Sequence, residues 1–193
     1  MPFAIDEETV TKWWSEPESV VDPEIDIESR VVEYKETVWT PIGEFQNDEH
    51  RKSAEAGIQT AMLKTVVAFM NTDGGELVIG VRDSDSAITG IEVDLVSLSL
   101  DESDLDSYEL RLMSLLGSRI DSLAHRQVRI DFKKHDSGTA CHVSVSPSPM
   151  PRFGRPFAHG NKAAKPTFWV RAGNATEQLD GPEMVEYIAQ HWA

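Results

Sequence analysis

A helical apolar period that leads directly into a glycine pair and a buried strand is the feature that most constrains the fold. The spacing predicts an amphipathic helix from about Asp48 to Asn71, with Asn47 or Asp48 as its cap. Residues 71–75 (NTDGG) are expected to end it, because glycines can adopt backbone angles that other residues avoid. ELVIGV (76–81) then reads as a buried strand. The apolar residues that recur at intervals of three and four are Ile58, Met62, Val66, Phe69 and Met70.

The remaining segments alternate irregularly between strand and helix patterns. Such an order indicates an α+β fold with a mixed, mainly antiparallel sheet flanked by helices. We expect one domain over residues 27–193, preceded by an N-terminal helix and acidic arm over residues 1–26. Strands are predicted at 30–39, 88–93 (as a hairpin partner of 76–81), 127–134, 140–148 and 167–173, and further helices at 6–14, 104–117 and 181–192.

The composition excludes several classes of protein. The chain has 193 residues and lacks an apolar run approaching the roughly 18 residues of a membrane span. The opening MPFAIDEETV lacks the basic and apolar regions of a signal peptide. A single cysteine, Cys141, rules out an intrachain disulfide or a Cys-based zinc site and is expected to be a small core residue. These features favour a cytoplasmic protein with no membrane contact.

The net charge of −15 is distributed unevenly along the chain. Residues 1–109 hold 7 Lys and Arg against 26 Asp and Glu, and residues 174–193 hold none against 4. Residues 110–173, in contrast, hold 11 Lys and Arg against 3 acids. A local basic surface matters more to a phosphate backbone than the global charge does, so nucleic acid is an admissible partner. The alternative is that these charges scatter over a solvated surface.

Six sequence blocks along the chain form a recognisable set. They are ESRVVEYK (28–35), LKTVVAFMNTDGGELVIGV (63–81) with ITGIEVD (88–94), DSYELRL (106–112), VSVSPSPMP (143–151), FWVRAGNATEQL (168–179) and EYIAQHW (186–192). Taken in order, they closely resemble the Schlafen AlbA_2 domain as it occurs in bacteria. One block alone could arise by chance, but six in the same order are a specific match that covers roughly residues 27–192.

The resemblance implies a mixed α/β fold and association with nucleic acid. Some members are endoribonucleases that cut transfer and ribosomal RNA with three carboxylates and a divalent metal. Carried over to the matching blocks, those carboxylates are Glu28, Glu33 and Asp83. Arg82 stands where many members have another acid, so the third position could instead be Asp85. Eukaryotic members double this domain, whereas this chain has one copy, so an RNA cleft would require a homodimer.

The chemistry of these residues suits Mg²⁺ or Mn²⁺, which prefer hard oxygen ligands. Glu33 and Lys35 are two apart on a predicted strand and therefore point to the same face, where Lys35 can stabilise charge on a reacting phosphate. Glu28 can join them only if the chain bends, because five residues of straight strand span roughly 16 Å. Asp83 can reach Glu33 from the end of the neighbouring strand, or can instead bond its own turn.

A long loop at 149–166 carries most of the remaining candidates for nucleic-acid binding. Cations are interleaved there with Phe153 and Phe157, a mixture that can grip phosphates and stack on bases. The alternative is a loop whose aromatics anchor it to the body of the protein. Arg171, after the FWV strand, can contact phosphate or fix the following turn. The candidate cations of the loop are Arg152, Arg155, Lys162 and Lys165, with His159 beside them.

Two principal functional hypotheses follow. The first is a homodimeric endonuclease that depends on Mg²⁺ or Mn²⁺, with Lys35 assisting catalysis and structured RNA such as transfer RNA favoured over DNA. The second is a non-catalytic DNA- or RNA-binding or regulatory module with the same fold. A purely protein-binding role is a third reading, which the acidic first half of the chain favours. Convergence of the three acids beside a basic groove would favour the enzyme.

Overall fold

The computed structural model describes residues 29–121, 124–157 and 164–192. The arm over residues 1–26 lies outside these ranges, and so do Glu28, His159 and Lys162. The predictions made for those residues therefore stay predictions.

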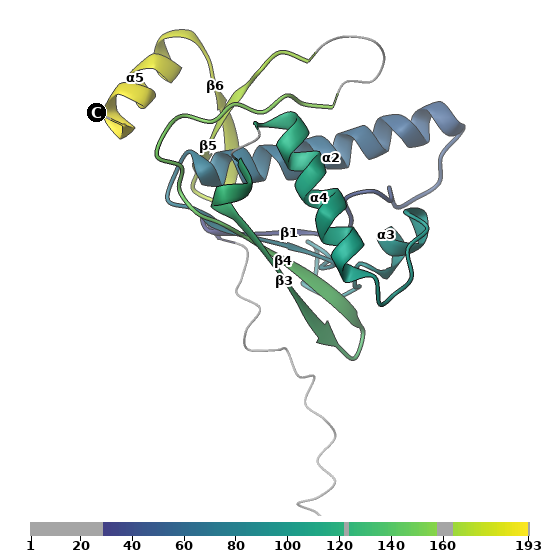
Figure 1. Cartoon of the computed structure of the whole chain (residues 1–193). Helices are drawn as coiled ribbons and strands as arrows, with labels where there is room; N and C mark the ends of the chain where they lie inside the picture. The colour runs from purple at the N-terminus through teal and green to yellow at the C-terminus, as the bar shows by residue number, and fades with distance from the viewer. Residues whose placement is uncertain (1–28, 122–123, 158–163, 193) are drawn as a thin grey trace, which may run out of the picture.

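A four-stranded mixed sheet forms the centre of the fold (Figure 1). Its strands are β1 (Val32–Lys35), β2 (Gly75–Ile79), β4 (Gly138–Val145) and β3 (Val128–His135), in that spatial order. β1 runs parallel to β2, whereas the β2–β4 and β4–β3 pairs are antiparallel. The predicted α+β class with a mainly antiparallel sheet is confirmed. The single parallel pair arises because a long helix, rather than a hairpin turn, connects β1 to β2.

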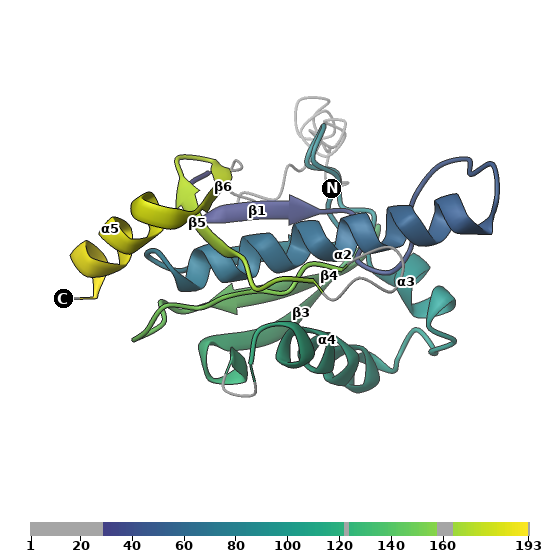
Figure 2. The same cartoon turned by 90° about the horizontal axis from the view of Figure 1, so that it is seen from above.

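That connecting helix, α2 (Asp48–Met70), is the central helix of the molecule (Figure 2). It begins as predicted, where the Asn47 side chain accepts a hydrogen bond of 2.9 Å from the backbone N–H of His50. Its last six residues, from Thr65 to Met70, are all buried, so this end of the helix is not amphipathic. The sheet covers one side of α2 and the β5–β6 hairpin packs against another. The helix therefore needs apolar residues on more than one side at this end.

A second helix, α4 (Leu105–Arg119), covers the β3 edge of the same sheet face (Figure 2). Its Tyr108 is fully buried and packs edge-on against Trp39 and Phe132. Cys141 on β4 is also fully buried in this core, as expected, and burial raises the pKa of its thiol well above the ordinary range. The described residues contain no helix with the length and apolar character needed to cross a membrane.

The prediction of a strand at residues 88–93 is wrong. Only Ile88 forms an isolated bridge, to Val81, and the chain then turns at Gly90 into the short helix α3 (Glu92–Ser97). Gly90 has φ of +76° and leaves no room for a side chain, because a Cβ would lie 2.9 Å from the Cα of Gly138 and overlap the Glu92 carboxylate. The close approach of two backbones at this glycine therefore ends the hairpin that the alternation suggested.

A two-stranded hairpin and a final helix complete the chain. The hairpin comprises β5 (Phe168–Ala172) and β6 (Ala175–Leu179), and the helix is α5 (Gly181–His191). β6 was not predicted, because its sequence ATEQL is mostly exposed and lacks alternating apolar residues. The Tyr187 hydroxyl donates a 2.8 Å hydrogen bond to the carbonyl of Asn71, which attaches α5 to the end of α2.

Candidate functional site

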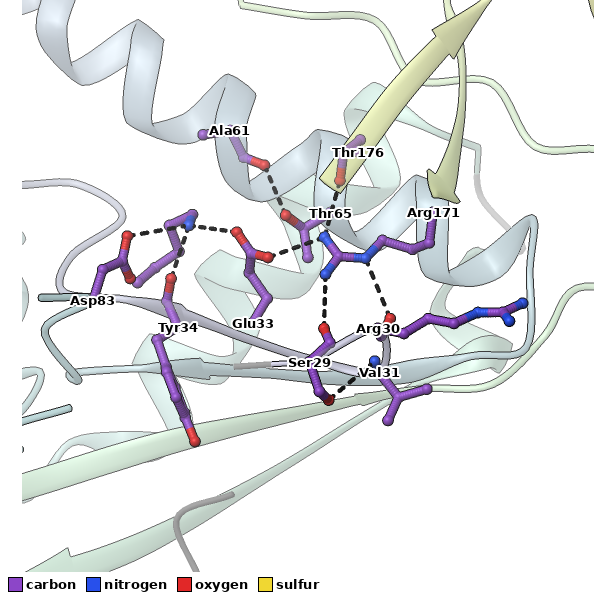
Figure 3. Close-up of polar contacts among 11 residues, drawn as sticks. Ser29, Arg30, Val31, Glu33, Tyr34, Ala61, Thr65, Asp83, Arg171 and Thr176 are labelled. Carbon is purple, nitrogen blue, oxygen red and sulfur yellow. Dashed lines mark hydrogen bonds and ion pairs between the residues drawn. The ribbon is translucent and has the colours of Figure 1, made fainter. Parts of the chain in front are cut away.

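The β1 strand divides its side chains between the two faces of the sheet, as its period of two requires. Figure 3 shows Glu33 on the side of β1 that faces α2, whereas Tyr34 points to the opposite side. Tyr34 packs there with Val32 in a separate buried cluster, while Glu33 and Lys35 share a pocket with residues of α2. The predicted common face of Glu33 and Lys35 is therefore confirmed.

The chain bends directly before β1. The backbone N–H of Ser29 donates a hydrogen bond of 3.1 Å to the carbonyl of Val32, and the N–H of Val31 bonds the Ser29 hydroxyl at 3.3 Å. Ser29 thus lies beside Val32 instead of continuing the line of the strand. The described residues show the bend that assigning Glu28 to the site demanded, although Glu28 itself is outside them.

Lys35 links the two described carboxylates of the predicted site. Its Nζ atom lies 2.7 Å from Oε1 of Glu33 and 3.8 Å from Oδ2 of Asp83, and it donates a further bond of 2.8 Å to the Tyr34 carbonyl. Asp83 reaches this point because β2 runs parallel to β1, so the chain leaving β2 emerges at the same end of the sheet as Lys35. Figure 3 shows Asp83, Glu33 and Arg171 in a row across this region.

Arg171, on β5, binds the other oxygen of Glu33. Its Nη1 atom lies 3.0 Å from Oε2 of Glu33 and 3.2 Å from the Thr176 hydroxyl. Its Nη2 donates to the Ser29 carbonyl at 3.0 Å and its Nε to the Arg30 carbonyl at 3.3 Å (Figure 3). The side chain is only 1% exposed. Arg171 therefore fixes both the Glu33 carboxylate and the bend that precedes β1.

A pocket of about 290 Å³ opens beside these groups. Three cationic side chains, Lys35, Lys64 and Arg171, line it together with the single carboxylate of Glu33. The excess of positive charge makes the pocket suitable for an anion such as a phosphate. Its other lining residues come from α2 and from the β5–β6 hairpin: Ala61, Thr65, Asn174, Ala175 and Thr176.

The environment of Asp83 alters its acidity. Partial burial is the main cause that raises the pKa of Asp83, and the neighbouring Glu33 and Glu36 carboxylates raise it further. The Lys35 ammonium opposes this shift and lowers the pKa of Asp83, but the net direction is upward. A carboxylate with a raised pKa accepts a proton more readily than an ordinary aspartate does.

Asp85, the alternative for the third acid, is engaged in its own turn. Its Oδ1 accepts a hydrogen bond of 3.1 Å from the backbone N–H of Ala87, and its Oδ2 lies 3.0 Å from Nη1 of Arg82. The Ala87 bond and the Arg82 charge both lower the pKa of Asp85. Of the two aspartates, Asp83 is the one that pairs with Lys35. The geometry therefore favours Asp83 over Asp85 as the third acid of the site.

Arg152, expected to contact nucleic acid, lies inside the protein. Its side chain is 7% exposed, and its Nη1 atom lies 2.6 Å from Oδ2 of Asp121. Its Nε donates a bond of 2.8 Å to the Ser148 hydroxyl, and its Nη2 bonds Gln127 at 3.5 Å. The guanidinium group thus ties together three segments of the fold. Arg152 is therefore buried and engaged within the fold, and its guanidinium is not presented to a nucleic acid.

Arg155 and Lys165 are exposed at the base of the predicted basic loop. The base is closed by an isolated bridge between Gly154 and Thr167, whose two backbone bonds measure 3.0 and 2.8 Å. The bridge brings Arg155 and Lys165 near each other, because each lies within two residues of it. Lys162 lies outside the described residues.

The aromatic residues of this loop serve as anchors. Phe153 packs against Phe168 of β5 with 5.4 Å between ring centroids. Phe157 is half-buried against the core, with the Arg119 guanidinium 4.0 Å above its ring. The described geometry thus supports the anchoring alternative over base stacking for both rings.

Lys64 is a site residue that sequence reasoning missed. It lies on α2 beside Thr65 in the pocket, and its Nζ atom is 6.0 Å from the centroid of the Trp169 ring. A signal was present, because Lys64 is the only charged residue between Gly57 and Asn71 in the most buried part of the helix. A lone cation in an otherwise apolar segment is unusual, which marks Lys64 as a candidate binding residue.

Replacing Arg171 with lysine should lower the free energy of unfolding by about 1–3 kcal/mol, because an ammonium cannot reproduce the planar set of bonds to Glu33, Ser29 and Arg30. Urea denaturation followed by circular dichroism would measure the loss. The exposed Arg155→Lys variant is the matched control and should change stability by less than about 0.5 kcal/mol. Equal stabilities of the two variants would contradict a structural role for Arg171.

Comparison with known proteins assigns the chain to a family. The family model described as Schlafen, AlbA_2 matches residues 28–180, which is most of the chain. No curated protein matches the sequence. Among solved structures, the DIP2311 protein from Corynebacterium diphtheriae is similar, with a TM-score of 0.51 and 17% sequence identity. The match covers 85% of this chain and 28% of that one, so the present chain corresponds to a minor part of the longer protein.

The low identity to the solved structure supports a shared fold only, whereas the family model carries the assignment. It spans β1 to β6 and includes Glu33, Lys35, Asp83 and Arg171. This chain therefore belongs to the Schlafen AlbA_2 family, a membership that points to a function related to nucleic acid.

Proposed function

We propose that this protein is a divalent-metal-dependent endonuclease that acts on structured RNA such as transfer RNA. Glu28, Glu33 and Asp83 would form its acidic site, with Mg²⁺ or Mn²⁺ as the cofactor. The observation that carries the proposal is the convergence of Glu33 and Asp83 on the Lys35 ammonium, at 2.7 and 3.8 Å. These groups adjoin a pocket with an excess of cationic side chains, which is the environment that a phosphodiester requires.

The donor set is compatible with a hard cation. Carboxylate oxygens are the ligands that Mg²⁺ and Mn²⁺ prefer, and Lys35 already places a positive charge between the two acids. The Asp83 side chain is 57% exposed, so a cation from solvent can reach its carboxylate. Within the described residues, no group of three or more His, Cys, Asp or Glu side chains is arranged to hold a metal. The proposal therefore needs Glu28 as the third ligand.

A bound metal would polarise the phosphate and make a coordinated water more acidic. The residues of the chain would supply the remaining functions. Lys35 and Lys64 would bind non-bridging phosphate oxygens at the pocket. Asp83, which lies beside Lys35 and Glu33, would supply a further carboxylate oxygen to the metal. Arg171 would hold the Glu33 carboxylate in a fixed orientation, because it bonds Oε2 from a buried position.

The proposed substrate, structured RNA, also requires residues that bind its phosphate backbone. The exposed Arg155 and Lys165, at the base of the basic loop, would contact the phosphate backbone, as the sequence predicts for Lys162. A pocket of about 290 Å³ is too small to enclose a structured RNA. A second protomer would therefore supply the opposite wall of the RNA-binding cleft. Light scattering coupled to size-exclusion chromatography, with and without transfer RNA, would test the homodimer directly.

The test is incubation of the purified protein with total transfer RNA and with single- and double-stranded DNA, in Mn²⁺ or Mg²⁺ and in EDTA. We expect cleavage of transfer RNA with either metal and none in EDTA, and stronger cleavage of RNA than of DNA. Cleavage that persists in EDTA would contradict the metal requirement. Nucleic acid that is shifted in a gel but stays intact under every metal condition would contradict catalysis.

A non-catalytic nucleic-acid-binding module is the second candidate, and one observation favours it. Both oxygens of Glu33 are already engaged, Oε1 by Lys35 and Oε2 by Arg171. A carboxylate with two cationic partners is well suited to stabilise the fold. Glu33 would have to give up its ion pair with Lys35 before it could bind a metal. In this case Mn²⁺ would leave the thermal unfolding temperature unchanged, whereas the nuclease reading predicts stabilisation by metal binding.

A further inference from the structure

A strip of basic residues follows the outer edge of the sheet, remote from the Glu33 pocket. Residues 126–134 contain four Lys and Arg residues and one Asp, in a chain whose net charge is −15. All four cations are exposed. The strip is named here the β3 basic strip and consists of Arg126, Arg129, Lys133 and Lys134, the first in the 3-10 helix η1 (Ala124–Gln127) and the others on β3.

The β3 basic strip lies on the opposite edge of the sheet from β1. The strand order β1-β2-β4-β3 puts three inter-strand spacings between the two edges, or roughly 14 Å. Arg129 and Lys133 point to the sheet face opposite to that of Glu33, because Ile130 and Phe132 between them pack against the main core. By the same alternation Lys134, at the exposed end of β3, lies on the face of Ile130 and Phe132, so Arg129 and Lys133 carry the inference. The tip of the β3–β4 hairpin extends beyond α4 (Figure 1).

The surroundings of the strip offer hydrogen-bond donors that suit phosphate. A hollow of about 370 Å³ lies beside Arg126 and Arg129, and its lining also includes the polar residues Gln127, Ser144 and Ser146 and the acid Asp131. Amide and hydroxyl side chains, together with Arg and Lys, are among the groups that commonly bind phosphate oxygens. Arg129 and Lys133 are four residues apart, or about 13 Å, which corresponds to roughly four nucleotides of a stacked strand at ~3.4 Å each.

Asp131 is the one acid within the strip. Its Oδ2 lies 2.9 Å from Nε of Arg129, and the two side chains are 50% and 78% exposed. An exposed ion pair of this kind contributes little free energy, so a phosphate can replace the carboxylate at small cost. Asp131 therefore weakens the strip for a polyanion without blocking it, and its removal is a diagnostic change.

We infer that the β3 basic strip is a second docking surface for the phosphate backbone of a nucleic acid. The inference rests on the nucleic-acid association in the proposed function, but not on catalysis. The strip would hold a part of a long or folded RNA that lies away from the Glu33 pocket. The same residues could instead bind an acidic protein segment, or could prevent the β3 edge from pairing with another sheet.

The experiment measures fluorescence anisotropy of labelled transfer RNA with the full chain in EDTA, so that binding is read without cleavage. The Arg129→Gln/Lys133→Gln variant should bind about 10-fold more weakly at moderate salt, and the slope of log K against log salt should fall by about two. Asp131→Asn should bind several-fold more tightly. Arg51→Gln/Lys52→Gln removes the same charge from the exposed start of α2 and should bind nearly as the unaltered protein does.

Three results would overturn the inference. Equal losses in the β3 and α2 double variants would mean that only net charge matters. Unchanged transfer RNA binding with lost binding of a labelled poly-glutamate peptide would assign the strip to an acidic protein partner. Unchanged binding accompanied by larger species in size-exclusion chromatography would assign it to edge protection. A protein that binds through the strip but never cuts RNA would refute the proposed nuclease and leave the inference standing.

Discussion

Replacing Glu33 with glutamine should reduce the rate of transfer RNA cleavage at least about 100-fold, the largest effect on activity that the site predicts. Glutamine keeps the size of the side chain but removes the charge that binds a cation and that pairs with Lys35 and Arg171. Single-turnover cleavage of labelled transfer RNA in Mn²⁺ would measure the loss. Binding in EDTA should change by much less, because the cationic residues of the pocket remain.

The control for this variant is Glu177→Gln, which removes an exposed acid from β6 and should cleave at the unaltered rate. Glu33 is only 13% exposed between two cations, so thermal unfolding must verify that Glu33→Gln is folded. Asp83→Asn is the second test, because its side chain is 57% exposed and its loss endangers the fold less. Full cleavage by both folded variants would refute the carboxylate mechanism.

Replacing Asp94 with alanine should lower the free energy of unfolding by about 3–5 kcal/mol, the largest effect on stability. The Asp94 carboxylate is fully buried and accepts hydrogen bonds from the backbone N–H groups of Val38, Trp39 and Thr40 at 2.8, 3.1 and 2.8 Å. Burial raises the pKa of Asp94, and the three donors oppose that shift. Alanine would leave three N–H groups without their acceptor where the chain leaves β1.

Urea unfolding monitored by tryptophan fluorescence would measure this change. The exposed Asp101→Ala variant is the control and should alter stability by less than about 0.5 kcal/mol. A loss below about 1 kcal/mol for Asp94→Ala would show that water or a rearranged loop satisfies these donors. Asp94 also positions the candidate site, because it holds residues 38–40, which follow Lys35, by hydrogen bonds.

Local sequence patterns were sufficient where one strong period decides the structure. The helix at 48–71 was predictable from its apolar spacing and from the Asn47 cap, and it spans Asp48–Met70. The alternation of β1 was enough to assign Glu33 and Lys35 to one face. The same patterns failed at 88–93, because the backbone contact at Gly90 depends on the β3–β4 hairpin, which is distant in sequence.

The roles of the arginines could not be read from sequence. Arg152 and Arg155 belong to the same basic stretch, yet Arg152 is buried and Arg155 is exposed. The difference arises because Asp121 and Ser148, from other segments, surround the Arg152 guanidinium. Arg171 is similar, since the carbonyls that it binds belong to residues about 140 positions earlier in the chain. Charge type alone predicts a surface, whereas burial depends on which segments meet.

The sequence by itself determined the family, the α+β class, the long helix and the candidate acids, because each depends on residue types at short and regular spacing. Only the tertiary structure decided which groups meet. The parallel pairing of β1 with β2 brings Asp83 to Lys35, and the β5–β6 hairpin brings Arg171 to Glu33. These contacts join residues about 50 to 140 positions apart, and packing of whole elements, rather than local backbone preference, sets such distances.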